Sequence, residues 1–391
     1  MSKKEKNPRL GRVGGQAVLE GVMMRSGDDI SIAVRREDGE IVSKNSKFTS
    51  VRKKHKFLNI PILRGCVNFV EMMKMSFSTM KDSTKLLGLT EFDEETKFDR
   101  WLKRKFGDRI MNVIMAIATV LGVLIAIGLF TVLPMLITTW IKGLVGGDET
   151  KWSYNFLFSL ISGVIRIIIF IVYMILVSLM KDIKRTFEYH GAEHKSIACY
   201  ESGMELTPAN AKKCTRFHPR CGTSFIFVIL ILSILIFSLV PWKTDTFTDK
   251  LVMLLLRFAL LPVVTGIGYE FLMYAGKHPN KCSLALSFPG LLMQRITTKE
   301  PDEEQLEVAI KALKLAMPEE FPEEAALEVE RLAKIAEEDA KKKAETEAET
   351  ASDGETDEVI AEEPAKAEPE EADKTEETAE EAEKPSDTDA E

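Results

Sequence analysis

The sequence predicts a mainly α-helical protein that crosses a membrane about four times, with a small α+β region before the membrane and an acidic tail after it. Charged residues are absent from 110 to 141 and from 222 to 242, and each stretch is long enough for a membrane helix of about 20 residues. The whole-chain averages, 45% hydrophobic and 29% charged, describe an ordinary soluble protein. They conceal a composition that is sharply segregated along the chain.

A β-hairpin is expected in the N-terminal region, residues 1 to 109. Apolar and polar residues alternate from Ile30 to Arg36, turn-forming residues follow at 37 to 40, and Ile41 begins a second apolar run. The glycine-rich string from 11 to 25 matches neither the P-loop nor the dinucleotide fingerprint. We expect turns there, or a lid over a site, and no nucleotide-binding loop.

A helix is expected over residues 61 to 88. Pro61 suits a helix start, and apolar residues from Val67 to Met80 recur at helical spacing. Packing against the hairpin is the first interpretation of this helix. The second is a helix that lies in the membrane interface.

The predicted membrane domain covers residues 110 to 280. Its four apolar blocks are 110 to 141, 152 to 180, 222 to 242 and 251 to 276. The connecting segment 181 to 222 carries eight lysine and arginine residues, whereas the other two loops carry two each. By the positive-inside rule, this segment and both termini face the cytoplasm, so we expect a multi-pass protein of the cell membrane.

Cytoplasmic helices are expected over residues 281 to 343. The apolar stretch from Ser283 to Met293 is too short to span a bilayer. Pro301 and the acidic residues after it predict an amphipathic helix that ends near Met317, and a second helix is expected over 323 to 343.

The acidic charge of the chain belongs to its C-terminal end. Residues 344 to 391 contain 21 acidic residues and three lysines, and their net charge of −18 is more negative than the −8 of the whole chain. The residues before 344 are therefore net positive. The tail has almost nothing to bury, so we expect it to be disordered.

The string from Tyr189 to Lys195 carries the chemistry of a metal site. On a helix, His190, Glu193 and His194 share one face because they are three and four residues apart. The order H-x-x-E-H is the inverted form of the zinc-hydrolase motif, in which two histidines bind the metal and the glutamate is the general base. We therefore predict His190 and His194 as metal ligands and Glu193 as the catalytic residue.

A catalytic zinc needs a third protein ligand, and the sequence offers two sources. Glu270 lies in the fourth apolar block, where a carboxylate is costly without a partner; such a partner could instead be a lysine. His218 and Cys221 are three residues apart and supply nitrogen and sulfur donors. Together with His190 and His194 they would form a closed structural site.

Five strings occur together in one order: GGQAVLEGVMMR (14 to 25), YHGAEHK (189 to 195), HPRCGTSF (218 to 225), GYE (268 to 270) and ITTKEP (296 to 301). They resemble the YqhQ family of bacterial membrane proteins over roughly residues 8 to 317. The resemblance implies a multi-spanning membrane protein with a metal-type motif, described as a predicted metal-dependent enzyme. The matching positions are His190, Glu193, His194, His218 and Cys221.

We expect a membrane-embedded, zinc-dependent hydrolase that acts on a peptide or a lipid headgroup at the cytoplasmic membrane face. Membrane lipids and a second copy of the chain are the expected partners. No nucleic acid is expected, because basic segments beside a membrane suit anionic lipid. Two alternatives stay open: a non-catalytic scaffold with a structural zinc site, and a transporter component, suggested by Arg166 and Glu270 within predicted spans.

Overall fold

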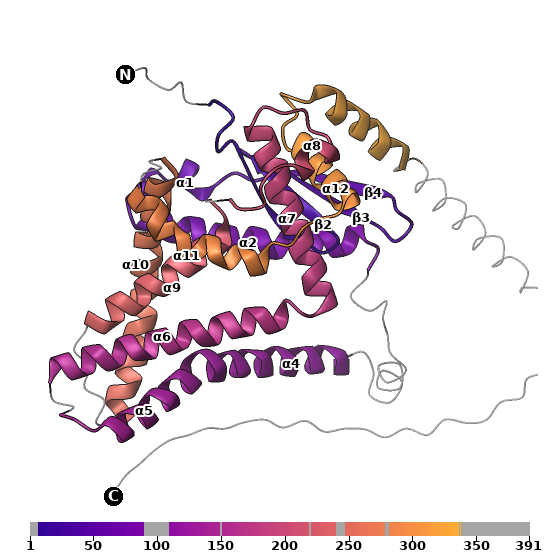
Figure 1. Cartoon of the computed structure of the whole chain (residues 1–391). Coiled ribbons are helices and arrows are strands. Elements are labelled where there is room, and N and C mark those ends of the chain that lie inside the picture. Colours follow the sequence, from indigo (N-terminus) through magenta and orange to yellow (C-terminus); the bar gives the residue numbers. More distant parts are fainter. Residues whose placement is uncertain are drawn as a thin grey trace, which may run out of the picture. The chain divides into compact units, whose positions relative to one another are not determined.

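In the computed structural model, the described part of the chain is mainly helical and contains one β-sheet, formed by N-terminal residues (Figure 1). The structure describes residues 7–89, 109–148, 151–218, 220–239, 247–277, 281–335 and 337. Contacts divide the chain into residues 1–330 and residues 331–391. The elements that position the site belong to the first of these units.

Four antiparallel strands form the sheet, in the order in which they follow along the chain. They are β1 (Val13–Val18), β2 (Gly21–Ser26), β3 (Asp29–Arg35) and β4 (Ile41–Lys47). The pair β3 and β4 confirms the predicted hairpin, with Arg35 opposite Ile41.

The glycine-rich string from 11 to 25 forms strands β1 and β2 in place of the expected turns or lid. Leu19 and Glu20 make the two-residue connection, and Glu20 has a positive φ of 49°. Gly21 is required for a different reason, because a Cβ atom there would lie 2.2 Å from the carbonyl oxygen of Ala33. Glycine therefore allows close strand pairing here.

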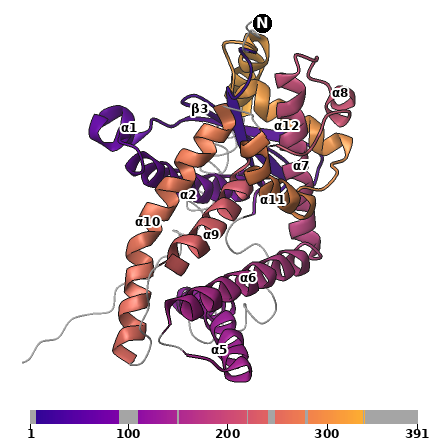
Figure 2. The same ribbon diagram turned by 60° about the vertical axis from the view of Figure 1, so that its left-hand side comes forward.

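Each face of the sheet is covered by helices, as side chains alternate between the two faces. On one face, Val22 and Met24 pack with residues of α7 (Lys181–Glu201) and α12 (Glu303–Leu315). On the other face, Met23 and Ile32 pack near α2 (Leu63–Leu86). The sheet thus lies between α2 and the pair α7 and α12 (Figure 2).

Helix α2 confirms the helix predicted over 61 to 88, and it packs on the sheet as the first interpretation expected. Two short helices, α1 (Val51–Lys54) and η1 (Lys56–Asn59), precede it. The side chains of Gln16 on β1 and Thr79 on α2 form a hydrogen bond between sheet and helix.

Two of the four predicted membrane blocks form helices long and apolar enough to cross a bilayer, Ile117–Val145 and Trp152–Val177. The first consists of α4 (Arg109–Ile127), a π-helical turn η2 (Gly128–Val132) and α5 (Leu133–Val145); the second is α6 (Trp152–Val177). The other two blocks form α9 (Gly222–Leu239) and α10 (Phe247–Lys277), whose apolar segments are shorter. Among the described residues, two helices thus have the length and composition of membrane spans, and four spans remain a prediction.

The basic segment 181 to 222 is largely helical, because α7 and the short α8 (Pro208–Lys212) occupy most of it. The stretch from Ser283 to Met293 belongs to a continuous helix, α11 (Lys281–Thr297), despite Pro289. The helix predicted after Pro301 is α12, which begins with a capping box between Asp302 and Gln305.

Only part of the predicted C-terminal region is described. The second predicted helix, 323 to 343, corresponds to helical residues 322–335, and its remainder falls largely outside the described residues. The predicted disorder of 344 to 391 falls entirely outside them.

Replacing Gly191 with alanine tests the packing of α7. A Cβ atom at Gly191 would lie 1.9 Å from the carbonyl oxygen of Lys299, so helix and backbone would have to separate. We expect Gly191→Ala to lower the free energy of unfolding by about 1–3 kcal/mol, measured by thermal unfolding in detergent. The control is Gly122→Ala, another helical glycine with open space around it, which should leave stability unchanged or slightly raised. Equal stability of the two variants would contradict this packing.

Candidate metal centre

Three ligand atoms converge between α7 and the start of α9. They belong to His190, His194 and Cys221, and all of them lie within 4.8 Å of one another. The helical spacing of four residues brings the two imidazoles together, with ring centroids 4.5 Å apart. Cys221 comes from the chain segment just before α9, so the third atom is brought in by tertiary structure.

Backbone carbonyls fix the orientation of both imidazole rings. His190 Nδ1 lies 2.9 Å from the carbonyl oxygen of Thr297, and His194 Nδ1 lies 2.5 Å from that of Arg216. A carbonyl only accepts, so each Nδ1 must carry the hydrogen and donate it. Nε2 is thereby the ring nitrogen that remains for a metal once it carries no proton, which is the arrangement that metal-binding histidines use.

Gln294 of α11 holds the segment that carries Cys221. Its Oε1 accepts from the backbone N–H of His218 at 2.8 Å. Its Nε2 donates to the carbonyl oxygen of His218 at 2.8 Å and to Ser224 Oγ at 2.9 Å. The side chain of Gln294 is fully buried, so these bonds are shielded from water and fix the loop on both sides of Cys221.

The charges of Cys221 and His190 stabilise each other. Cys221 Sγ lies 3.3 Å from His190 Nε2. Burial acts to raise the pKa of the thiol, but the two imidazoles lower this pKa well below its usual value. Burial acts to lower the pKa of His190, but Cys221 and Glu193 raise it to about 9. Their proximity therefore favours the proton on His190 over Cys221.

Glu193 is buried against the cluster. Its Oε2 lies 3.8 Å from His190 Nε2 and has no hydrogen-bond partner among the described residues. Burial raises the pKa of this carboxyl group. Strand β1 encloses it, because a Cβ atom at Gly15 would lie 3.0 Å from the Cγ of Glu193 and 2.5 Å from the carbonyl oxygen of Met23. Only glycine allows β1 this close to the carboxylate.

His218 lies beside the cluster and has partners of its own. Its ring centroid is 5.6 Å from that of His194. Its Nε2 lies 3.7 Å from a carboxylate oxygen of Glu201 and 3.2 Å from the guanidinium of Arg220. Glu201 also pairs with Arg220, so this group forms a charged layer next to the three ligands.

Glu270 lies in a different environment. It sits on α10 and forms a two-point salt bridge with Arg64 of α2, in which Arg64 Nε donates to Oε1 at 2.6 Å. The sequence allowed Glu270 to be a metal ligand or the partner of a lysine. It pairs with a basic residue, but that residue is an arginine of α2. The structure thus brings Cys221 to His190 and His194, and places Glu270 elsewhere.

The donor set suits a divalent metal, and zinc most of all. Two imidazole nitrogens and one thiolate are typical zinc ligands, and three protein ligands leave a fourth position open. Glu193 Oε2 is buried without a hydrogen bond and lies 3.8 Å from His190 Nε2, so a cation held at the cluster would stabilise this carboxylate. His190, His194 and Cys221 would hold the ion.

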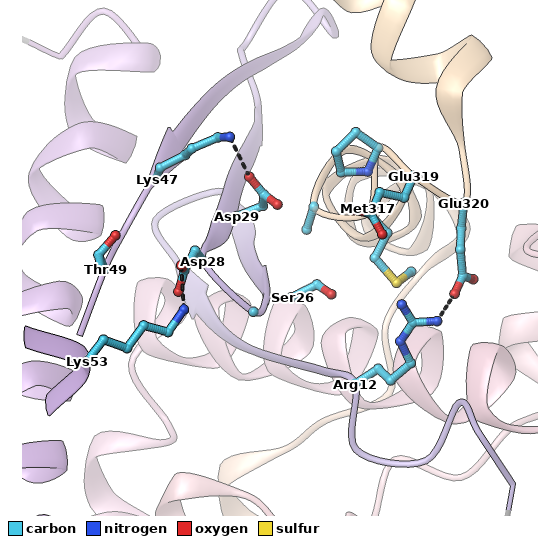
Figure 3. A pocket seen from close by; sticks show the side chains of 13 residues that line it. Arg12, Ser26, Asp28, Asp29, Lys47, Thr49, Lys53, Met317, Glu319 and Glu320 are labelled. Atoms are coloured by element: carbon cyan, nitrogen blue, oxygen red, sulfur yellow. Dashed lines mark hydrogen bonds and ion pairs between the residues drawn. The ribbon is translucent and has the colours of Figure 1, made fainter. Parts of the chain in front are cut away.

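A surface pocket of about 520 Å³ lies between the β2–β3 turn and the segment after α12 (Figure 3). Six of its seven charged side chains form ion pairs: Arg12 with Glu320, Lys47 with Asp29, and Lys53 with Asp28. None of the predicted site residues lines this pocket.

Comparison with known proteins supports the resemblance found in the sequence. The profile of the family described as "Protein of unknown function (DUF1385)" matches residues 60–319. The chain is 34% identical over 305 residues to the protein of Bacillus subtilis named "Uncharacterized protein YqhQ". The aligned region covers 76% of this chain and 90% of that protein. No solved structure matches the chain.

Elemental analysis of detergent-purified variants tests the ligand set. We expect bound zinc to fall to background in His190→Ala, His194→Ala and Cys221→Ser, because each change removes one of three donors. Glu270→Gln is the matched control and should keep its zinc, since Glu270 pairs with Arg64. Loss of zinc in Glu270→Gln, or its retention in Cys221→Ser, would contradict this ligand set.

Zinc affinity should rise with pH across the neutral range. His190, with a pKa of about 9, carries a proton that the metal must displace, whereas Cys221 is already a thiolate. The affinity should therefore fall by about a factor of ten for each pH unit lost. Competition with a chelator of known affinity measures this slope, and a flat profile would show that His190 is neutral in the metal-free protein.

Proposed function

Since the chain belongs to the DUF1385 family, whose description names no activity, we propose from the site that it is a membrane-associated, zinc-dependent hydrolase. The observation that carries the proposal is the combination of three converging ligand atoms with a buried carboxylate. Glu193 lies next to His194 in the chain and one helical turn from His190, whose Nε2 is 3.8 Å from its carboxylate.

Each residue of the site has a role in this proposal. His190, His194 and Cys221 hold the ion, which when bound would polarise a substrate oxygen and make water more acidic. Glu193 is the general base and takes a proton at Oε2. Its raised pKa brings its proton affinity closer to the neutral range, which suits a group that must accept a proton and release it again.

The chain around the site supports a location next to the bilayer. Helix α7 begins at Lys181, four residues after the end of the candidate span α6. Cys221 directly precedes the apolar helix α9. One element of the site thus starts just after an apolar helix, and the other lies just before one. We propose that the substrate is held at the cytoplasmic membrane face, either as a peptide or as a lipid headgroup.

A structural zinc site is the second candidate, and one observation favours it. His194 is almost fully buried, and the ring of His218 lies close enough to the cluster to contribute a fourth ligand after a small movement. A closed site of four ligands would serve stability and leave Glu193 without a chemical role. The transporter alternative was suggested partly by Glu270, and the pairing of Glu270 with Arg64 removes that argument.

Replacing Glu193 with glutamine separates the two candidates. The change keeps the shape and the three ligands but removes the base. We expect zinc content to be unchanged and hydrolysis to fall by about 10²–10⁴-fold. The assay compares the products formed from a bacterial lipid extract and a peptide pool by reconstituted, zinc-loaded protein, using mass spectrometry.

Glu188→Gln is the control for this experiment. Glu188 is another carboxylate of α7, and it pairs with Lys184 and Gln305 away from the cluster. It should keep both zinc and activity. If wild type and Glu193→Gln form the same products at the same rate, the hydrolase is excluded and the structural site is favoured.

A further inference from the structure

Helix α2 presents an apolar face that no described residue covers. Val70, Met73, Phe77 and Met80 follow one another at spacings of three and four residues and so share one face of the helix. The exposed fractions are 64% for Val70 and 77% for Phe77, and Met73 and Met80 are also exposed. We call these four residues the α2 stripe.

The α2 stripe lies beside the side of the helix that the protein buries, since Met80 and the buried Ser83 are three residues apart. Gly65, Thr79 and Ser83 are the buried residues of α2, and they face the sheet and α10. In a helix on the surface of a soluble protein, the outward face is polar and the inward face apolar. Here the outward face carries the large apolar side chains, which marks an interaction surface.

Lysines accompany the α2 stripe on the outward side. Lys74, Lys81 and Lys85 are exposed, and none of them has an ion pair within the described part of the chain. The two acidic residues of α2 are engaged with the protein, since Glu71 accepts from Ser50 Oγ at 2.8 Å and Asp82 pairs with Lys44. The outward face is therefore apolar and positive.

The N-terminal end of α2 crosses the apolar segment of α10. A Cβ atom at Gly65 would lie 2.9 Å from the Cα of Gly266, so glycine allows the two backbones to approach closely. This is the kind of small-residue crossing that membrane helices use. The α2 stripe thus begins beside the apolar segment Phe258–Phe271 of α10, part of which is itself exposed.

We propose that α2 lies in the plane of an anionic lipid bilayer, with the α2 stripe in the acyl region and its lysines at the headgroups. The inference rests on the membrane location within the proposed function. A second copy of the chain is a poorer occupant, because a two-fold contact through this face would bring lysines together. An apolar stripe beside lysines complements an anionic bilayer, in which the acyl chains are apolar and the headgroups are negative.

This placement brings the candidate metal centre to the membrane surface. The methyl carbon of Met72 would lie 3.7 Å from a Cβ atom at Gly222, next to Cys221, and the rings of Phe69 and Phe225 are 6.3 Å apart. One side of α2 therefore contacts the start of α9 while the α2 stripe faces outward. A lipid-borne or membrane-held substrate would meet the site at the level of its headgroup.

Photo-crosslinking of the full chain tests the occupant directly. Phe77→p-benzoylphenylalanine is reconstituted in bilayers of phosphatidylcholine with phosphatidylglycerol, irradiated, digested and examined by mass spectrometry. Leu327→p-benzoylphenylalanine is the matched control, because Leu327 is also a helical apolar residue and is 66% exposed. We expect phospholipid adducts at position 77 in severalfold excess over position 327.

A second variant tests the charge. Adding Lys74→Gln, Lys81→Gln and Lys85→Gln should reduce the lipid adducts at 77 severalfold in anionic bilayers and leave them unchanged in phosphatidylcholine alone. The proposal is overturned if position 77 crosslinks to a second copy, to residues 90–108 or 344–391 of its own chain, or to lipid no more than position 327 does.

Zinc measured in the same samples keeps the two proposals apart. Lipid adducts at 77 without bound zinc would leave the location of α2 standing and remove the zinc-dependent hydrolase. Bound zinc without lipid adducts, in protein that remains in the membrane after alkaline carbonate, would overturn only the location of α2.

Discussion

The candidate site depends on one constraint, which is that two imidazoles on α7 must point the same nitrogen at one spot. Two carbonyl groups from distant parts of the chain impose it, that of Thr297 at the end of α11 and that of Arg216 before α9. A histidine ring that is free to rotate would lose both conformational entropy and its preferred tautomer when it bound a metal. The site therefore takes its shape only when α7, the end of α11 and the segment before α9 are packed together. Gly191 permits this packing because it lets the backbone of Lys299 approach α7.

Charge explains why this arrangement calls for a cation. Cys221, Glu193 and two imidazoles are buried together, and the basic groups that act on Glu193 are the neighbouring histidines, of which His190 Nε2 lies 3.8 Å from its Oε2. Without metal, proton sharing between His190 and Cys221 is the available compensation, and it shifts both pKa values strongly. A divalent ion would replace the imidazolium proton and satisfy the carboxylate at once. The layer formed by Glu201, His218 and Arg220 is balanced within itself, so it does not remove this need.

Local patterns in the sequence predict the parts of the fold that are determined locally. The hairpin of β3 and β4, the helix α2, the capped start of α12 and the shared face of His190, Glu193 and His194 all follow from spacing within a few residues. Strands β1 and β2 do not follow, because glycine has low strand propensity and Gly15 and Gly21 are explained only by the neighbours that approach them. The same limit applies to the third ligand. Cys221, His218 and Glu270 are chemically comparable candidates, and only tertiary packing by Gln294 and Arg64 separates them.

The position of α2 links the membrane to the chemistry. A helix that only covers a sheet needs one apolar side, and α2 uses small and polar residues such as Gly65, Thr79 and Ser83 for much of that contact. Met75 and Leu86 also pack against the sheet, but Phe77, Val70, Met73 and Met80 are exposed, where water would penalise them. That distribution is stable only if something apolar meets the outward face. Because Phe69 and Met72 of α2 contact the start of α9 beside Cys221, whatever covers the α2 stripe also lies near the candidate metal centre.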